Sequence, residues 1–64
     1  MIYVVIAYYF EGNLYCRTRE YKYGESIDIE EYEGIWGVFP DKKSADEYVA
    51  GLRDDKGERL IILE

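Results

Sequence analysis

The sequence contains no histidine and a single cysteine, and these absences remove most catalytic chemistry. Without histidine, neither a Ser-His nor a Cys-His pair can activate a nucleophile, and zinc lacks its usual ligands. No G-x-G-x-x-G or G-x-x-x-x-G-K-[ST] motif is present to bind a nucleotide phosphate. We therefore expect a protein that is not an enzyme and has no catalytic residue, cofactor or metal.

The lone Cys16 cannot form a disulfide within one chain, and small secreted domains usually depend on such bonds. This favours a cytoplasmic protein. The apolar residues 1–10 lack a basic leader and are shorter than the roughly 20 residues that span a bilayer, so we interpret them as a strand with no membrane partner.

The chain has 64 residues, of which 48% are hydrophobic and 17% aromatic, with a net charge of −6. A single domain over residues 1–64 accounts for this length. The apolar content is high enough to offset the entropy lost on ordering, so we expect a folded chain.

Hydrophobic patterning predicts the order β-β-β-α-β. The expected strands are 2–10, 14–23 after a turn at 11–13, 34–39 before Pro40, and 58–64. Both faces of the first strand are apolar. The unbroken apolar run 60–63 predicts a last strand that is buried on both faces. Trp36 is either a core residue or a contact anchor, and we favour the core because Gly34 and Gly37 flank it.

A helix follows the third strand. The sequence SADE, Ser44 to Glu47, has the spacing of a capping box, although the helix could also begin at Asp41. Gly57 is the expected stop. The apolar positions recur with helical spacing and should face the sheet: Ala45, Tyr48, Val49 and Leu52.

These elements predict an α+β fold of two layers, a mostly antiparallel twisted sheet with one helix on one face. The uncovered face would then expose Tyr3, Val5 and Tyr9. It would also expose a stripe on the second strand: Tyr15, Arg17, Arg19, Tyr21 and Tyr23. A homodimer through this Tyr-rich sheet face would cover it. The stripe could instead stack nucleic-acid bases, but a net charge of −6 opposes phosphate, so we expect no direct nucleic-acid binding.

Negative charge is concentrated in residues 25–33, which we call the acidic segment. It holds five carboxylates and no basic residue, whereas the rest of the chain has nine acids and eight bases. The carboxylates belong to Glu25, Asp28, Glu30, Glu31 and Glu33. Strand, loop and short helix all remain open for this segment. If it is extended, it presents one charge per roughly 6 Å, against one phosphate per about 3.4 Å of a DNA strand.

Several uses of the carboxylates are possible. They could simply hydrate the surface of a homodimeric structural or regulatory module. Paired carboxylates could perform acid–base chemistry, but no second catalytic residue type accompanies them. Calcium suits clustered carboxylates, but their spacing does not match an EF-hand loop.

Apolar and aromatic residues, among them Tyr32, are interleaved with the acids. In its small size, its negative charge and its lack of catalytic residues, the chain resembles the small acidic DNA-mimic inhibitors that bacteriophages make to disable host proteins. The resemblance implies that the acidic segment occupies the DNA-binding surface of a basic host protein, with the bacterial histone-like protein HU as the first expectation. It also implies the host cytoplasm as location. The implied partner-binding residues are Glu25, Asp28, Glu30, Glu31, Tyr32 and Glu33.

Overall fold

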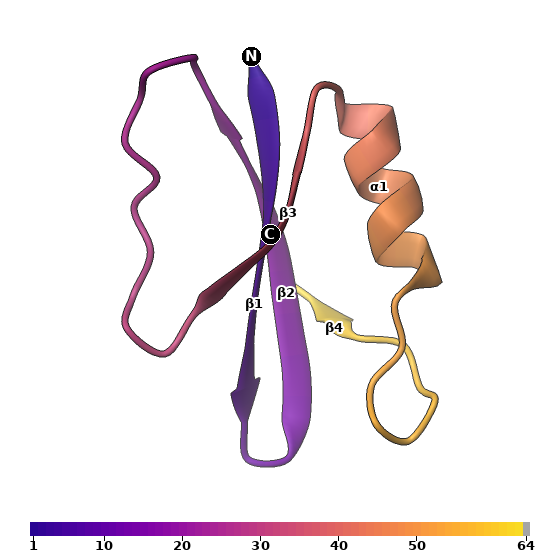
Figure 1. Ribbon diagram of the computed structural model, residues 1–64. Coiled ribbons are helices and arrows are strands. Elements are labelled where there is room, and N and C mark those ends of the chain that lie inside the picture. Colours follow the sequence, from indigo (N-terminus) through magenta and orange to yellow (C-terminus); the bar gives the residue numbers. More distant parts are fainter. Residues whose placement is uncertain (64) are drawn as a thin grey trace.

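The computed structural model describes residues 1–63 and has the predicted β-β-β-α-β order. The elements are β1 (Ile2–Phe10), β2 (Asn13–Tyr21), β3 (Gly34–Phe39), α1 (Lys42–Gly51) and β4 (Ile61–Ile62). They form one four-stranded sheet of order β3-β1-β2-β4 with the helix on one side (Figure 1). β1 pairs antiparallel with β2 and β3, and β4 pairs parallel with β2. The predicted α+β fold with a mostly antiparallel sheet is confirmed.

A two-residue turn joins β1 to β2. Glu11 and Gly12 both have positive φ angles, 50° and 79°, as in the primed turns whose twist matches that of the flanking strands. Phe10 and Asn13 are already paired across the hairpin, so β2 begins one residue earlier than predicted. It also ends earlier, at Tyr21, because the chain turns after that residue.

β1 is a central strand and is buried on both faces. Val4, Val5 and Ile6 have no exposed surface. Val5 and Ala7 lie on the face that α1 covers, where a buried cluster forms from Ala7, Leu14, Cys16 and Leu60, with Val49 and Leu52 packed against it. Cys16 is a small buried hydrophobe, and its burial raises the pKa of the thiol.

The register corrects one expectation about the two faces. Tyr3 and Val5 pair with Glu20 and Thr18, so they share the helix face and are not exposed together with the tyrosine and arginine stripe. That stripe lies on the opposite face with Val4 and Ile6. Residues 22–33 run beside this second face (Figure 1), which we call the segment face.

The helix begins at the earlier of its two predicted positions. Asp41 is the N-cap, and its carboxylate accepts a hydrogen bond of 2.7 Å from the Ser44 N–H. The capping box starting at Ser44 is therefore wrong, because Ser44 already lies in the first turn. The predicted apolar stripe is confirmed, with Ala45 fully buried.

The end of the helix also differs from the prediction. It closes at Gly51 with Leu52 as C-cap, and not at Gly57. Gly57 lies in the following loop with a φ of 78°, where its N–H donates to the Asp54 carbonyl. The Asp54 carboxylate accepts hydrogen bonds from the N–H groups of Lys56 and Glu58. Residues that the sequence pattern assigned to the helix therefore belong to this loop.

The predicted burial of the last strand is wrong. β4 contains only Ile61 and Ile62, which are 43% and 56% exposed. It lies at the edge of the sheet beside β2, and Leu60 alone of this run is buried. An apolar run of four residues does not distinguish a central strand from the edge of a small sheet.

Substituting the two candidate caps separates their roles. Asp41→Ala should lower the urea midpoint of unfolding, because it removes the acceptor for the Ser44 N–H, while Ser44→Ala should lower it less. The pKa of Asp41 is lowered by the hydrogen bond from the Ser44 backbone, so its contribution is present above the ordinary Asp pKa of about 3.9 and is lost as pH falls through the folded-state value. The wild type and Asp41→Ala should therefore converge in stability below about pH 4. A larger loss from Ser44→Ala would contradict the Asp41 cap.

Gly37 should not tolerate a side chain. A Cβ there would lie 2.6 and 2.9 Å from the Phe39 ring, which packs against Tyr48 at a centroid distance of 5.1 Å. We expect Gly37→Ala to cost about 1–2 kcal/mol in urea unfolding, because the Phe39 ring must move from its contact. Gly51→Ala is the control, since nothing lies within 4 Å of its added Cβ. Equal effects of the two substitutions would contradict this packing.

Candidate functional site

A turn with the same hydrogen-bond pattern closes each end of the acidic segment. In the first, the Glu25 N–H donates to the Lys22 carbonyl and the Glu25 carboxylate accepts from the Lys22 N–H at 2.8 Å. In the second, the Glu33 N–H donates to the Glu30 carbonyl and the Glu33 carboxylate accepts from the Glu30 N–H at 2.9 Å. Two of the five predicted acids thus close turns.

Residues 26–29, between the turns, belong to no helix or strand. Ile27 and Ile29 are half-buried, whereas Ser26 and Asp28 are exposed. This alternation places apolar side chains toward the sheet and polar ones toward water. Of the three conformations left open by the sequence, the structure has a loop.

Glu33 also fixes the segment to the sheet. Its Oε1 atom lies 3.0 Å from Arg17 Nη2, and the two side chains are only 4% and 20% exposed. Arg17 comes from the segment face of β2, opposite Ile6 of β1. A charge pair this well shielded from water is expensive to break, because one partner would be left buried without a counter-charge.

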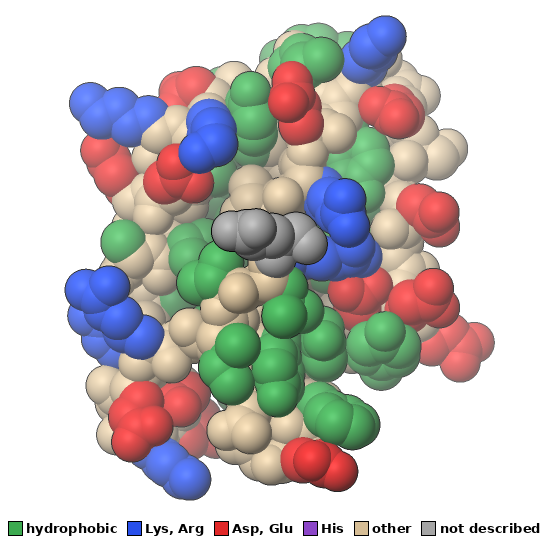
Figure 2. All heavy atoms as spheres, turned by 180° about the vertical axis from the view of Figure 1, so that it is seen from behind, with side chains coloured by type: hydrophobic (Ala, Val, Ile, Leu, Met, Phe, Trp, Pro, Cys, Tyr) green, Lys and Arg blue, Asp and Glu red, His purple; other side chains and the backbone are tan. Residues whose placement is uncertain are grey.

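Asp28, Glu30 and Glu31 remain as exposed carboxylates in the acidic segment. Figure 2 shows acidic side chains along the right-hand edge of the molecule, with basic side chains beside them toward the sheet. Arg19 contributes to this basic neighbourhood, since it lines a hollow of about 320 Å³ together with Glu30 and Glu33. The surface is therefore acidic at its rim and mixed in charge where it meets the sheet.

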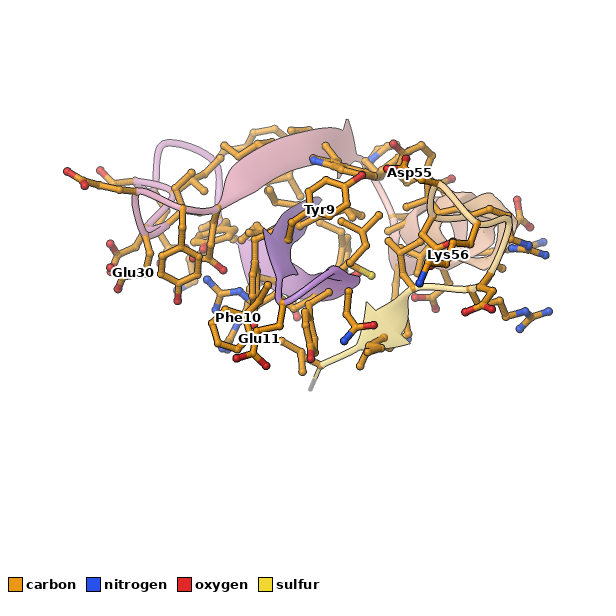
Figure 3. The ribbon with its side chains drawn as sticks, turned by 90° about the horizontal axis from the view of Figure 1, so that it is seen from below. Tyr9, Phe10, Glu11, Glu30, Asp55 and Lys56 are labelled. Atoms are coloured by element: carbon orange, nitrogen blue, oxygen red, sulfur yellow. The ribbon has the colours of Figure 1, made fainter. Side chains whose placement is uncertain are left out.

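Tyr32 connects the acids to an aromatic surface at the end of the hairpin. It is 65% exposed, and its ring meets that of Tyr8 edge-on at 5.1 Å. A wide hollow of about 540 Å³ is lined by Tyr8, Tyr9, Phe10 and Tyr32. Figure 3 shows Phe10 pointing away from Tyr9, toward the side on which Glu30 lies. Exposed apolar area thus lies next to free carboxylates.

The six residues expected to bind a partner therefore divide into two groups. Asp28, Glu30, Glu31 and Tyr32 are exposed, and their side chains take no part in the two turn hydrogen bonds. The carboxylates of Glu25, which is also exposed, and of Glu33 accept backbone N–H groups in the two turns. Phe10 and Arg19 lie beside this group, since each lines a hollow together with Tyr32. The sequence placed Arg19 in the exposed stripe of β2 but assigned neither residue to partner binding. In each turn a glutamate follows three residues after the residue whose backbone it binds, Glu25 after Lys22 and Glu33 after Glu30. This spacing is the sequence feature from which the two turns could have been predicted.

Within residues 1–63, no group of three potential ligands is placed to hold a metal ion. Over the same residues, no helix has the length and hydrophobicity needed to cross a membrane. No protein family, curated protein or solved structure matches this chain.

Glu33 and Glu31 should respond differently to neutralisation. Glu33→Gln leaves Arg17 partly buried without its counter-charge and should destabilise the fold by about 2 kcal/mol. Glu31→Gln removes an exposed charge and should change stability by less than about 0.5 kcal/mol. Urea unfolding at pH 7 measures both, and equal effects would show that the ion pair does not hold the segment in place.

Proposed function

We propose that this chain is a non-enzymatic cytoplasmic binding protein whose acidic segment occupies the DNA-binding surface of a basic host protein. The supporting observation is the set of free carboxylates on Asp28, Glu30 and Glu31 around the exposed Tyr32. Carboxylates steer a basic partner toward the surface, and an aromatic side chain supplies contact area that slows its release.

We propose that only part of the acidic segment contacts the partner directly. Glu33 is paired with Arg17, and the Glu25 carboxylate is engaged by a backbone N–H, so these two acids contribute through the shape of the segment. Asp28, Glu30 and Glu31 supply the phosphate-like charges. Tyr32 and Phe10, which line the aromatic hollow, supply the apolar contact.

The proposed partner is a nucleic-acid-binding protein of a bacterial host, and the histone-like protein HU is the first one to test. HU is proposed because it binds DNA mainly through basic residues and backbone contacts, and the acidic segment offers charge without a base sequence. The proposed origin is a bacteriophage, in keeping with the resemblance to phage DNA-mimic inhibitors.

The test compares two variants that lose the same charge. The first, Asp28→Asn with Glu30→Gln and Glu31→Gln, neutralises the proposed surface and spares the buried Glu33. The control, Glu47→Gln with Asp55→Asn and Glu58→Gln, neutralises three exposed acids elsewhere; Figure 3 shows Asp55 at the opposite end of the molecule from Glu30.

In the first experiment, purified HU carrying a fluorescent DNA duplex is titrated with each protein, and the displacement of DNA is measured. In the second, each protein is immobilised and used to capture partners from nuclease-treated bacterial lysate. We expect the wild type and the control to displace DNA and the first variant to lose at least tenfold in affinity, with binding weakening as salt rises. If all three proteins retain the same lysate proteins, or none, the proposal fails. If a basic protein other than HU is retained by the same pattern, only the choice of HU is wrong.

A further inference from the structure

β3 forms an open edge of the sheet. Among the described residues, the strand order places it beyond β1 with no strand on its outer side, and Figure 3 shows no other helix or strand beyond it. An exposed edge presents unpaired N–H and C=O groups that can pair with another strand. The opposite edge, β4, offers only two residues for such pairing.

The composition of β3 is unusual for an exposed edge. Gly34–Phe39 contains no charged residue, although 34% of the chain is charged. Ile35, Trp36 and Val38 are 45%, 38% and 53% exposed. The expected burial of Trp36 is thus not observed. An edge of this kind is normally protected by a charged residue, a proline or a β-bulge. β3 has no charged residue, and Pro40 comes only after the strand, so the one protective feature within it is a register irregularity at Trp36.

The pairing of β3 with β1 establishes which face each residue occupies. Ile35 and Val38 pair with Ile6 and Val4 and therefore lie on the segment face. The remaining paired residues, Gly34, Gly37 and Phe39, lie on the helix face. The register shifts between Val5 and Ile6, which leaves Trp36 as the extra residue of a bulge.

We propose that two copies of this chain form a dimer by antiparallel pairing of their β3 strands around a two-fold axis. In the register that sets Ile35 opposite Val38 of the second copy, paired residues share a sheet face, as antiparallel neighbours must. Gly34 then faces Phe39, and Trp36 faces Gly37, which leaves room for the indole. Ile35 and Val38, which are exposed in each single chain, then cover one another across the two copies.

The lack of charge in β3 lowers the electrostatic cost of bringing a second copy to this edge. Each chain carries a net charge of −6, so most approaches of two copies bring carboxylates together. Contact through the uncharged β3 places no carboxylates of the strands opposite each other, and a two-fold axis makes one patch serve both chains. The proposed dimer uses neither the acidic segment nor its partner, so it stands independently of the proposed function.

Sedimentation velocity from about 10 μM to about 1 mM tests the dimer. The wild type should pass from monomer to dimer across this range, and Ile35→Lys with Val38→Lys should raise the dissociation constant at least tenfold by placing like charges opposite each other. Tyr23→Lys with Ile62→Lys changes two exposed residues elsewhere, one of them in β4, by the same charge and should dimerise as the wild type does. A monomeric wild type, or a dimer that persists in the β3 variant, overturns the proposal.

Cross-linking tests the register without depending on the fold of the lysine variant. With Ile35→Cys and Val38→Cys in one chain, the introduced thiols face each other across the two copies, and oxidation by diamide should yield a covalent dimer. Ile35→Cys alone should not, because its thiols are separated along the strands, and Cys16 is buried. Equal yields from the double and single variants would rule out this register.

Discussion

The central strand β1 is apolar on both faces, and each face therefore needs its own cover. Val5 is buried on the helix face and Val4 and Ile6 on the segment face, all with no exposed surface. Over residues 1–63 the structure has one helix, which covers one face. Residues 22–33 cover the other without forming regular structure, and this explains why a loop with five carboxylates lies against a sheet.

Holding a charged loop against an apolar face requires specific bonds. The two turns use the carboxylates of Glu25 and Glu33 as acceptors for backbone N–H groups, so the acids satisfy polar groups that a loop would otherwise leave unpaired. Arg17 extends from the sheet to Glu33 and neutralises the one acid that is nearly buried. The segment therefore combines a structural inner side, with Ile27 and Ile29, and an exposed acidic outer side.

The two proposals use different parts of the molecule. The acidic surface, with Tyr32 and the hairpin end, is suited to a basic partner because charge and aromatic area lie side by side. β3 is suited to a second copy because it is uncharged and its exposed side chains complement themselves. A dimer of this geometry would extend the sheet through both chains and would present the acidic surface twice, which would increase the avidity for a partner with two accessible sites.

Local chemistry was sufficient to predict much of this protein from its sequence. The β1–β2 hairpin, the bounds of β3 and the apolar stripe of α1 follow from alternation, turn residues and helical spacing, which act over a few neighbouring residues. The edge position of β4 and the exposure of Trp36 depended on which strands became neighbours. The Asp41 cap is itself a local bond to the Ser44 N–H, and the sequence pattern left two positions open for it. The roles of the acids depended on the same placement: Glu33 and Glu31 are alike in sequence, and only the approach of Arg17 from a strand 16 residues away buries one and leaves the other in water.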